Sequence, residues 1–167
     1  MAPEVTTTYA GEHVDLVSAK SFDQVVKDLR AELGTASTEK LMDRLSASDT
    51  FEEYADECEA FAGRSNLIEV GYLNWGKVLS LAGVPMRTQC FVVGNPLTAR
   101  KLLEAGGPEV GLYLPTKILV FEDANGVAHV SYDKFAPIMA RYTNEGLTKV
   151  ASVIDGVLAN LAAAAAG

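Results

Sequence analysis

The sequence predicts an α+β domain, with a mainly antiparallel sheet of about five strands and helices packed on one face. Strand and helix patterns follow one another along the 167 residues without strict alternation, which favours this class over a parallel α/β fold. Asn125 and Gly126 separate two strand-like runs, and an Asn-Gly pair in that position is a strong hairpin signal. We expect a single domain over 1–167, because this length supports one hydrophobic core and is short for two.

A loose leader is expected over 1–11, followed by a strand over 13–19 and a helix. Ser21 and Gln24 fit a capping box at the start of this helix. The apolar residues that follow have helical spacing, and they are Phe22, Val25, Val26, Leu29 and Leu33. Gly34 is expected to end the helix.

Residues 35–63 are predicted to form a helical, acidic insertion. Thr50 and Glu53 fit a second capping box, and Gly63 is expected to end the helix that they begin. Residues 1–63 contain 14 acidic and 5 basic residues, whereas the remainder contains 8 and 9. We interpret the acidic run as a solvated helix face, since a calcium site would need a loop with alternating oxygen ligands.

The middle of the chain is predicted to contain a strand over 66–73, a short helix capped by Asn74, and a strand over 88–93. This last strand stops at Gly94, Asn95 and Pro96, before a helix over 97–105. Asn95 either caps the turn or presents its amide to a ligand, and we favour the cap. Gly94 is expected to adopt a backbone conformation that other residues disfavour.

The hairpin strands are expected over 116–122 and 127–132. Asp133 is predicted to cap the next helix, with Pro137 in its first turn. A last helix with an apolar stripe from Leu147 to Leu161 precedes an alanine-rich tail over 162–167, for which no function is required.

Two stretches together resemble the family called domain of unknown function 302. They are GNP at 94–96 and LYLPTKILVFEDANGVAHVSY at 112–132. The resemblance covers roughly 66–142, and residues 14–34 stand where the first strand and helix of the family would be. It implies a small α+β domain that is often a homodimer. The family pattern has Ile-Asp-His where this chain has Leu73, Asn74 and Trp75, so any role of that histidine is lost here. The segment 35–63 lies outside the common pattern.

Composition excludes several classes of protein. A net charge of −8 without a basic stripe argues against nucleic-acid binding and against acidic membranes. Apolar runs fall short of the ~20 residues that cross a bilayer, and MAPEVTTTYAGEH lacks a signal-peptide pattern, so a cytoplasmic location is expected. Cys58 and Cys90 are expected to be reduced core residues, and no metal site or cofactor is predicted.

The candidate ligand-binding residues are Trp75, Asn95, Tyr113, Glu122 and Tyr132, because aromatic rings and a few polar groups line small-molecule pockets. Glu122 and Tyr132 are also the candidate catalytic pair, as base and acid. His129 alternates with Ala128 and Val130, so we expect it on the solvent or dimer face.

These residues favour a domain that binds a small, partly apolar molecule between sheet and helices. One alternative is an enzyme of the isomerase, lyase or hydrolase kind that works by proton transfer with a carboxylate base. The other is an interaction module whose acidic helices bind a basic partner. The sequence itself specifies no reaction.

Overall fold

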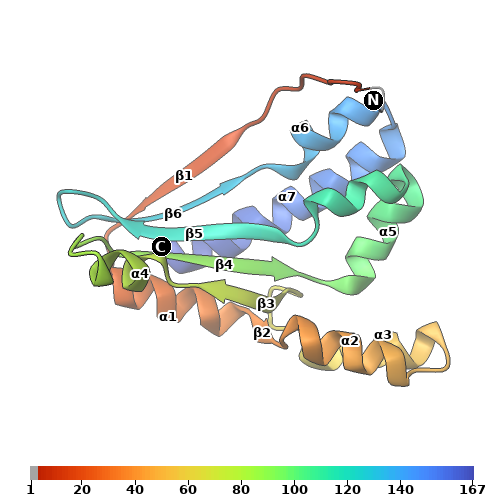
Figure 1. Cartoon of the computed structure of the whole chain (residues 1–167), viewed down its shortest axis with the longest axis horizontal. Helices are drawn as coiled ribbons and strands as arrows, with labels where there is room; N and C mark the ends of the chain where they lie inside the picture. Colours follow the sequence, from red (N-terminus) through yellow and green to blue (C-terminus); the bar gives the residue numbers. More distant parts are fainter. Residues whose placement is uncertain (1–3) are drawn as a thin grey trace.

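The computed structural model describes residues 4–167, so the first three residues of the predicted leader lie outside the described residues. One six-stranded sheet has the order β1-β6-β5-β4-β3-β2 (Figure 1). Its strands are β1 (His13–Ser18), β2 (Gly34–Thr35), β3 (Ile68–Leu73), β4 (Thr88–Gly94), β5 (Thr116–Glu122) and β6 (Ala128–Asp133). All neighbours are antiparallel except β2 and β3, which are parallel.

The predicted α+β class with a mainly antiparallel sheet is confirmed. The sheet has six strands rather than five because Gly34, expected to end a helix, and Thr35, expected to begin the helical insertion, form the short strand β2 beside Ile68 and Glu69. The helices are α1 (Phe22–Glu32), α2 (Thr38–Ala47), α3 (Phe51–Phe61), α4 (Trp75–Leu81), α5 (Pro96–Gly106), α6 (Phe135–Met139) and α7 (Glu145–Ala166), with 3-10 turns η1 (Pro108–Tyr113) and η2 (Ala140–Tyr142).

The main core lies between one face of the sheet and the pair α1 and α7, which pack side by side across it (Figure 1). Alternate strand residues point into this layer, as the period of two in a strand requires. Phe91 and Val93 of β4 and Ile118 and Val120 of β5 are fully buried there. The predicted apolar stripe of α1 meets them from the other side.

The alanine-rich end of the chain is part of α7 rather than a tail. Ala162 and Ala165 are 0% exposed in the main core, and the Ser18 hydroxyl donates a hydrogen bond of 2.6 Å to the carbonyl of Ala166. Small side chains let α7 approach the sheet and α1 closely. By length and composition alone α7 could cross a membrane, but a core helix meets the same two criteria, and seven of its residues are buried in this domain.

The start of α6 differs from the predicted cap. β6 continues through Asp133, which pairs with His13 of β1, and the Asp133 carboxylate accepts from the His13 ring at 2.8 Å instead of capping the helix. The cap comes from Asp155 in α7, whose carboxylate accepts hydrogen bonds from the backbone N–H groups of Phe135 and Ala136.

The helices α1 and α3 end near Gly34 and Gly63, but through extended residues Leu33 and Ala62 instead of a left-handed glycine. The two glycines are needed for close approach. A Cβ on Gly34 would lie 1.7 Å from the carbonyl oxygen of Phe61, and one on Gly63 would lie 2.3 Å from the nitrogen of Gly34. This backbone contact joins α2 and α3 to the edge of the sheet.

Both cysteines are free and buried, as predicted, and burial raises the pKa of each thiol. Cys90 belongs to the sheet face opposite the helices, with His129 of β6. His129 is less exposed than expected, because its ring stacks on Phe121 with centroids 4.7 Å apart and its Nδ1 lies 2.8 Å from the Asp15 carboxylate.

Candidate functional site

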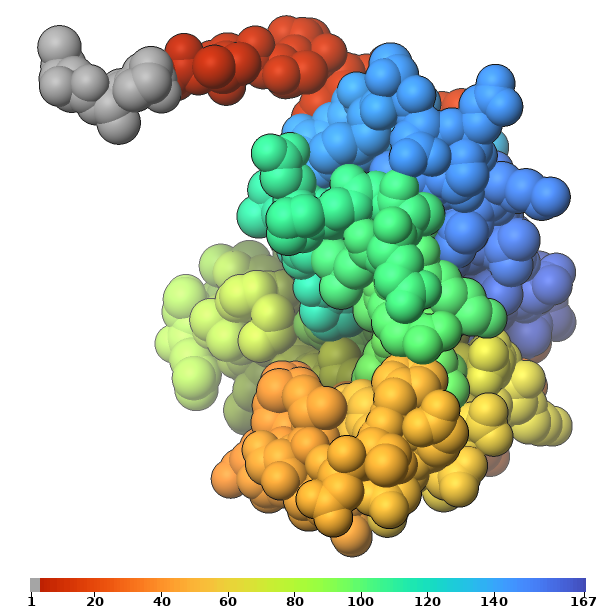
Figure 2. Space-filling model, turned by 90° about the vertical axis from the view of Figure 1, so that its right-hand side faces the viewer, coloured from red at the N-terminus to blue at the C-terminus, as the bar shows by residue number. Residues whose placement is uncertain are grey.

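A cavity of about 650 Å³ lies where the end of β4 and the start of β5 meet α2, α3, α5 and α7, and Phe135 of α6 also lines it. Its wall combines α2 and α3 with α5 and α7, which Figure 2 shows together on one side of the molecule. The lining is mostly apolar, and representative residues are Leu41, Tyr54, Leu102, Val150, Val153 and Ile154. A volume between ~300 and ~1,000 Å³ with such a lining is typical of sites for small organic molecules.

Asn95 stands in the cavity wall at the start of α5, and it is 5% exposed. Its side-chain oxygen accepts from the backbone N–H of Leu97 at 2.9 Å, and its amide donates to the carbonyl of Asn66 at 2.9 Å. Both ends of the amide are therefore used in holding the turn after β4 against the loop before β3. Asn95 is a brace of the cavity wall, and Pro96 fills the first position of the helix.

Gly94 has an ordinary backbone conformation, contrary to the prediction, since it is not among the glycines with positive φ. Glycine suits this position because Pro115 packs closely against it, and a Cβ on residue 94 would lie 3.0 Å from the Cβ of Pro115. Leu114 and Pro115, which are joined by a cis peptide bond, also line the cavity. The GNP and LP stretches thus meet in space at one side of the cavity.

The polar groups of the wall are few. Burial, together with a hydrogen bond to the Cys58 thiol, raises the pKa of Tyr54 to about 12, so its phenol is neutral at neutral pH. Lys101 of α5 and Lys149 of α7 also line the cavity, and both side chains are exposed. The lining residues, all from the described part of the chain, include no aspartate or glutamate.

The five residues predicted as a binding site are not brought together. Only Asn95 lines the cavity. Trp75 begins α4 and is 44% exposed among other exposed apolar side chains. Tyr113 belongs instead to a cluster with Tyr9 and Tyr142 around the guanidinium of Arg141, whose carbon lies 4.4–5.4 Å from the three ring centroids. The Tyr113 hydroxyl donates a hydrogen bond to the Tyr9 hydroxyl, and this bond is the main cause that raises the pKa of Tyr113.

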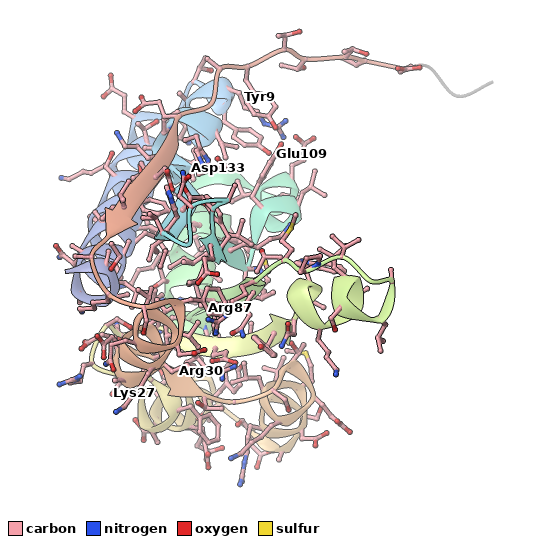
Figure 3. All side chains as sticks on the ribbon, turned by 90° about the vertical axis from the view of Figure 1, so that its left-hand side faces the viewer. Tyr9, Lys27, Arg30, Arg87, Glu109 and Asp133 are labelled. Atoms are coloured by element: carbon pink, nitrogen blue, oxygen red, sulfur yellow. The ribbon has the colours of Figure 1, made fainter. Side chains whose placement is uncertain are left out.

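Glu122 and Tyr132, the predicted base and acid, are also separated. Glu122 pairs with Ala128, four residues from Tyr132 along β6, which corresponds to about 13 Å at ~3.3 Å per strand residue. Glu122 forms an ion pair of 3.6 Å with Arg87, which lies beside α1 (Figure 3). Tyr132 is 5% exposed in the main core, and burial raises its pKa. The two side chains cannot share one substrate proton.

Other ionisable groups do not form a metal centre. Within residues 4–167, histidine, cysteine and carboxylate side chains are nowhere grouped in threes around a possible metal position. The carboxylates of α3 serve local contacts: Glu53 accepts from the backbone N–H of Asp49 at 2.9 Å, and Glu57 lies 3.6 Å from Arg44.

Sequence reasoning missed Tyr54, Lys101, Lys149 and Val153 as cavity residues. The apolar spacing of α7 identified its buried stripe, but the cavity wall comes from segments as far apart as Thr38 and Val157. No local signal marked these residues, because Val153 is 65% exposed and a single exposed apolar residue is not informative by itself.

Comparisons with known proteins agree with this fold. The crystal structure of an uncharacterised conserved DUF302 protein from Bacillus stearothermophilus is similar, with a TM-score of 0.63 and 17% sequence identity, over 91% of this chain and 96% of that chain. No curated protein matches the chain. The family model described as domain of unknown function DUF302 matches residues 42–166, which include all of α3 and most of α2, so the expectation that 35–63 lies outside the family pattern is wrong for 42–63. The resemblance read from the sequence is therefore confirmed, and the chain belongs to the DUF302 family.

Proposed function

We propose that this domain binds a small, largely apolar molecule in the cavity between the end of the sheet and α2, α3, α5 and α7. The observation that carries the proposal is the cavity of about 650 Å³ with its mostly apolar wall. The cavity opens to solvent, so an apolar ligand that enters it removes apolar surface from water. This burial stabilises the complex by about 25 cal/mol for each Å² of apolar surface buried.

The composition of the wall also argues for binding over proton-transfer catalysis. The amide of Asn95 is occupied by hydrogen bonds with Leu97 and Asn66, and the lining residues include no carboxylate or histidine that could act as a base. General acid and base catalysis needs such a group within hydrogen-bond reach of the reacting proton.

Fluorescence of the neutral apolar dye Nile red tests the proposal. The wild-type protein should give a saturable increase, and Ala99→Trp should abolish it, because Ala99 lines the cavity and a large ring there fills it. Ala159→Trp is the matched control, since Ala159 is exposed on α7 outside the wall, and it should bind as the wild type does. Absence of saturable binding to the wild type, or unchanged binding to Ala99→Trp, would overturn the proposal.

A homodimer is also proposed, through the exposed apolar segment 72–86. Lys77 is the only charged residue of this segment, and Trp75, Val78, Leu81 and Met86 are exposed. Exposed apolar patches of this kind mark contact surfaces. Two copies that each carry a net charge of −8 repel each other, and this repulsion is weakest between surfaces that carry few charged residues. In sedimentation equilibrium, Val78→Lys should shift the protein toward monomer, whereas Val5→Lys in the exposed leader should not. Equal masses for both variants would contradict this dimer.

A further inference from the structure

We infer that the ligand of this cavity is an amphipathic anion, with an apolar body in the cavity and an anionic group held at its mouth by Lys101 and Lys149. This inference rests on the proposed function and names the chemical class of its ligand. The observation behind it is the charge of the wall: two lysines and no carboxylates line the cavity, in a chain with 22 acidic and 14 basic residues.

The two lysines come from different helices that pack against each other, Lys101 from α5 and Lys149 from α7. Both side chains are exposed although they contribute to an apolar wall. A lysine in such a place covers apolar surface with its four-carbon stem and keeps its ammonium in water. The positive groups are therefore at the solvent side of the cavity, where the polar end of a bound amphiphile would lie.

Neither ammonium is neutralised by the protein. Other lysines, such as Lys20 and Lys134, form salt bridges with carboxylates. Within residues 4–167, neither Lys101 nor Lys149 takes part in a salt bridge. Arg100, the neighbour of Lys101, is instead paired with Glu104 at 3.5 Å. Two unpaired cations beside an apolar cavity attract an anion and repel a cation, and low-dielectric walls strengthen both effects.

A neutral ligand would use only the apolar wall, so the inference concerns the difference between an anion and its neutral analogue. An apolar chain contributes equally in decanoate and decan-1-ol, whereas only the carboxylate gains from the two ammonium groups. A carboxylate and a phosphate monoester share the required chemistry. Decyl phosphate therefore joins the comparison, to establish which anionic group the mouth prefers.

Displacement of Nile red by these three compounds tests the inference at low ionic strength, below the concentration at which the amphiphiles form micelles. The wild type should bind decanoate or decyl phosphate more tightly than decan-1-ol. Lys101→Gln and Lys149→Gln should each weaken anion binding about two- to five-fold, the size expected for a partly solvated ion pair. The double variant should lose the preference, with binding of decan-1-ol unchanged. Added salt should reduce the preference of the wild type.

Lys117→Gln is the matched control, because Lys117 is exposed on β5 and does not line the cavity. It should bind the anions as the wild type does, and an equal loss in Lys117→Gln would show a general charge effect and overturn the assignment. Equal affinity of the wild type for decanoate, decyl phosphate and decan-1-ol would overturn the anionic ligand and leave the cavity as a binding site. Failure of Nile red and all three compounds to bind would overturn the proposed function itself.

Discussion

Asp155 of α7 caps α6 by accepting a hydrogen bond of 3.0 Å from the backbone N–H of Ala136, and it also accepts from the N–H of Phe135. A carboxylate at the start of a helix satisfies N–H groups that have no partner within the helix. We expect Asp155→Ala to lower the free energy of unfolding in urea by about 1–2 kcal/mol. Asp133→Asn, at the position that the sequence favoured as the cap, should change it by less than about 0.5 kcal/mol. The reverse order would contradict this assignment.

Asn95 should matter for stability in the absence of any ligand. Asn95→Ala removes the acceptor for Leu97 and the donor to Asn66 from a buried position, so we expect a loss of about 1–3 kcal/mol in the free energy of unfolding. Asn160→Ala, on the exposed side of α7, is the control and should be nearly neutral. If Asn95→Ala unfolds like the wild type, the amide is not a brace.

Gly34 is required by the close backbone contact with the end of α3. Gly34→Ala should destabilise the protein by more than about 2 kcal/mol, because the new methyl group would meet the carbonyl of Phe61. Gly156→Ala should do the opposite. Outside the adjoining residues and the backbone of α7 itself, no atom lies within 4 Å of its new methyl group, and alanine in a helix interior is better than glycine by about 0.5–1 kcal/mol. In thermal denaturation, the melting temperature of Gly34→Ala should lie below that of the wild type and that of Gly156→Ala above it.

The short side chain of Ala162 should be needed where α7 enters the core. Ala162→Leu adds volume at a position with no exposure, and we expect overpacking to cost about 1–3 kcal/mol. The same substitution at exposed Ala159 should change stability by less than about 0.5 kcal/mol. Similar midpoints for the two variants in urea denaturation would show that the alanine-rich end packs loosely.

The hairpin turn should depend on pH through Asp123. Its carboxylate accepts from the backbone N–H groups of Val127 and Asn125, both at 2.9 Å, and these bonds, that of Val127 first, lower the pKa of Asp123. A carboxyl whose pKa is lower in the folded state contributes stability above its unfolded pKa of ~3.9, and that stability is lost as pH falls through the folded pKa. The melting temperature of Asp123→Asn should therefore lie below that of the wild type at neutral pH.

The difference should begin to narrow below about pH 4, where the unfolded chain becomes protonated, and should vanish once the pH has fallen below the lowered folded pKa of Asp123. Asp43→Asn, on the exposed side of α2, controls for the loss of one negative charge. A gap between wild type and Asp123→Asn that persists at low pH would show that the turn does not use the ionised carboxylate.

Local features of the fold could be predicted because their signals lie within a few residues. The capping hydroxyls of Ser21 and Thr50 accept from N–H groups three residues later, as expected. The cap of α6 could not be predicted, because Asp155 is about twenty residues away and β1 keeps Asp133 in the sheet. The resemblance of 94–96 and 112–132 to one family was informative because Gly94 and Pro115 touch in the folded chain.

The candidate site was harder to predict for a related reason. Residue type suggested Trp75, Tyr113, Glu122 and Tyr132, but cavities are made by what several distant segments leave unfilled, and residue type does not encode that space. Only Asn95 was correctly placed near the cavity, through its position at the end of a strand. Lys101 and Lys149 resemble ordinary solvated lysines until α5 and α7 are seen together.

The order of strands has a consequence for synthesis on the ribosome. Within residues 4–167, β1 has β6 as its only neighbour in the sheet, and the Ser18 hydroxyl donates a hydrogen bond to the carbonyl of Ala166. At ~5–20 residues per second, the first strand emerges on the order of ten seconds before its partners exist. During that interval its apolar side chains and those of α1 have nothing to cover them. We therefore expect the main core to form only after α7, which packs against α1 and the sheet, has been synthesised.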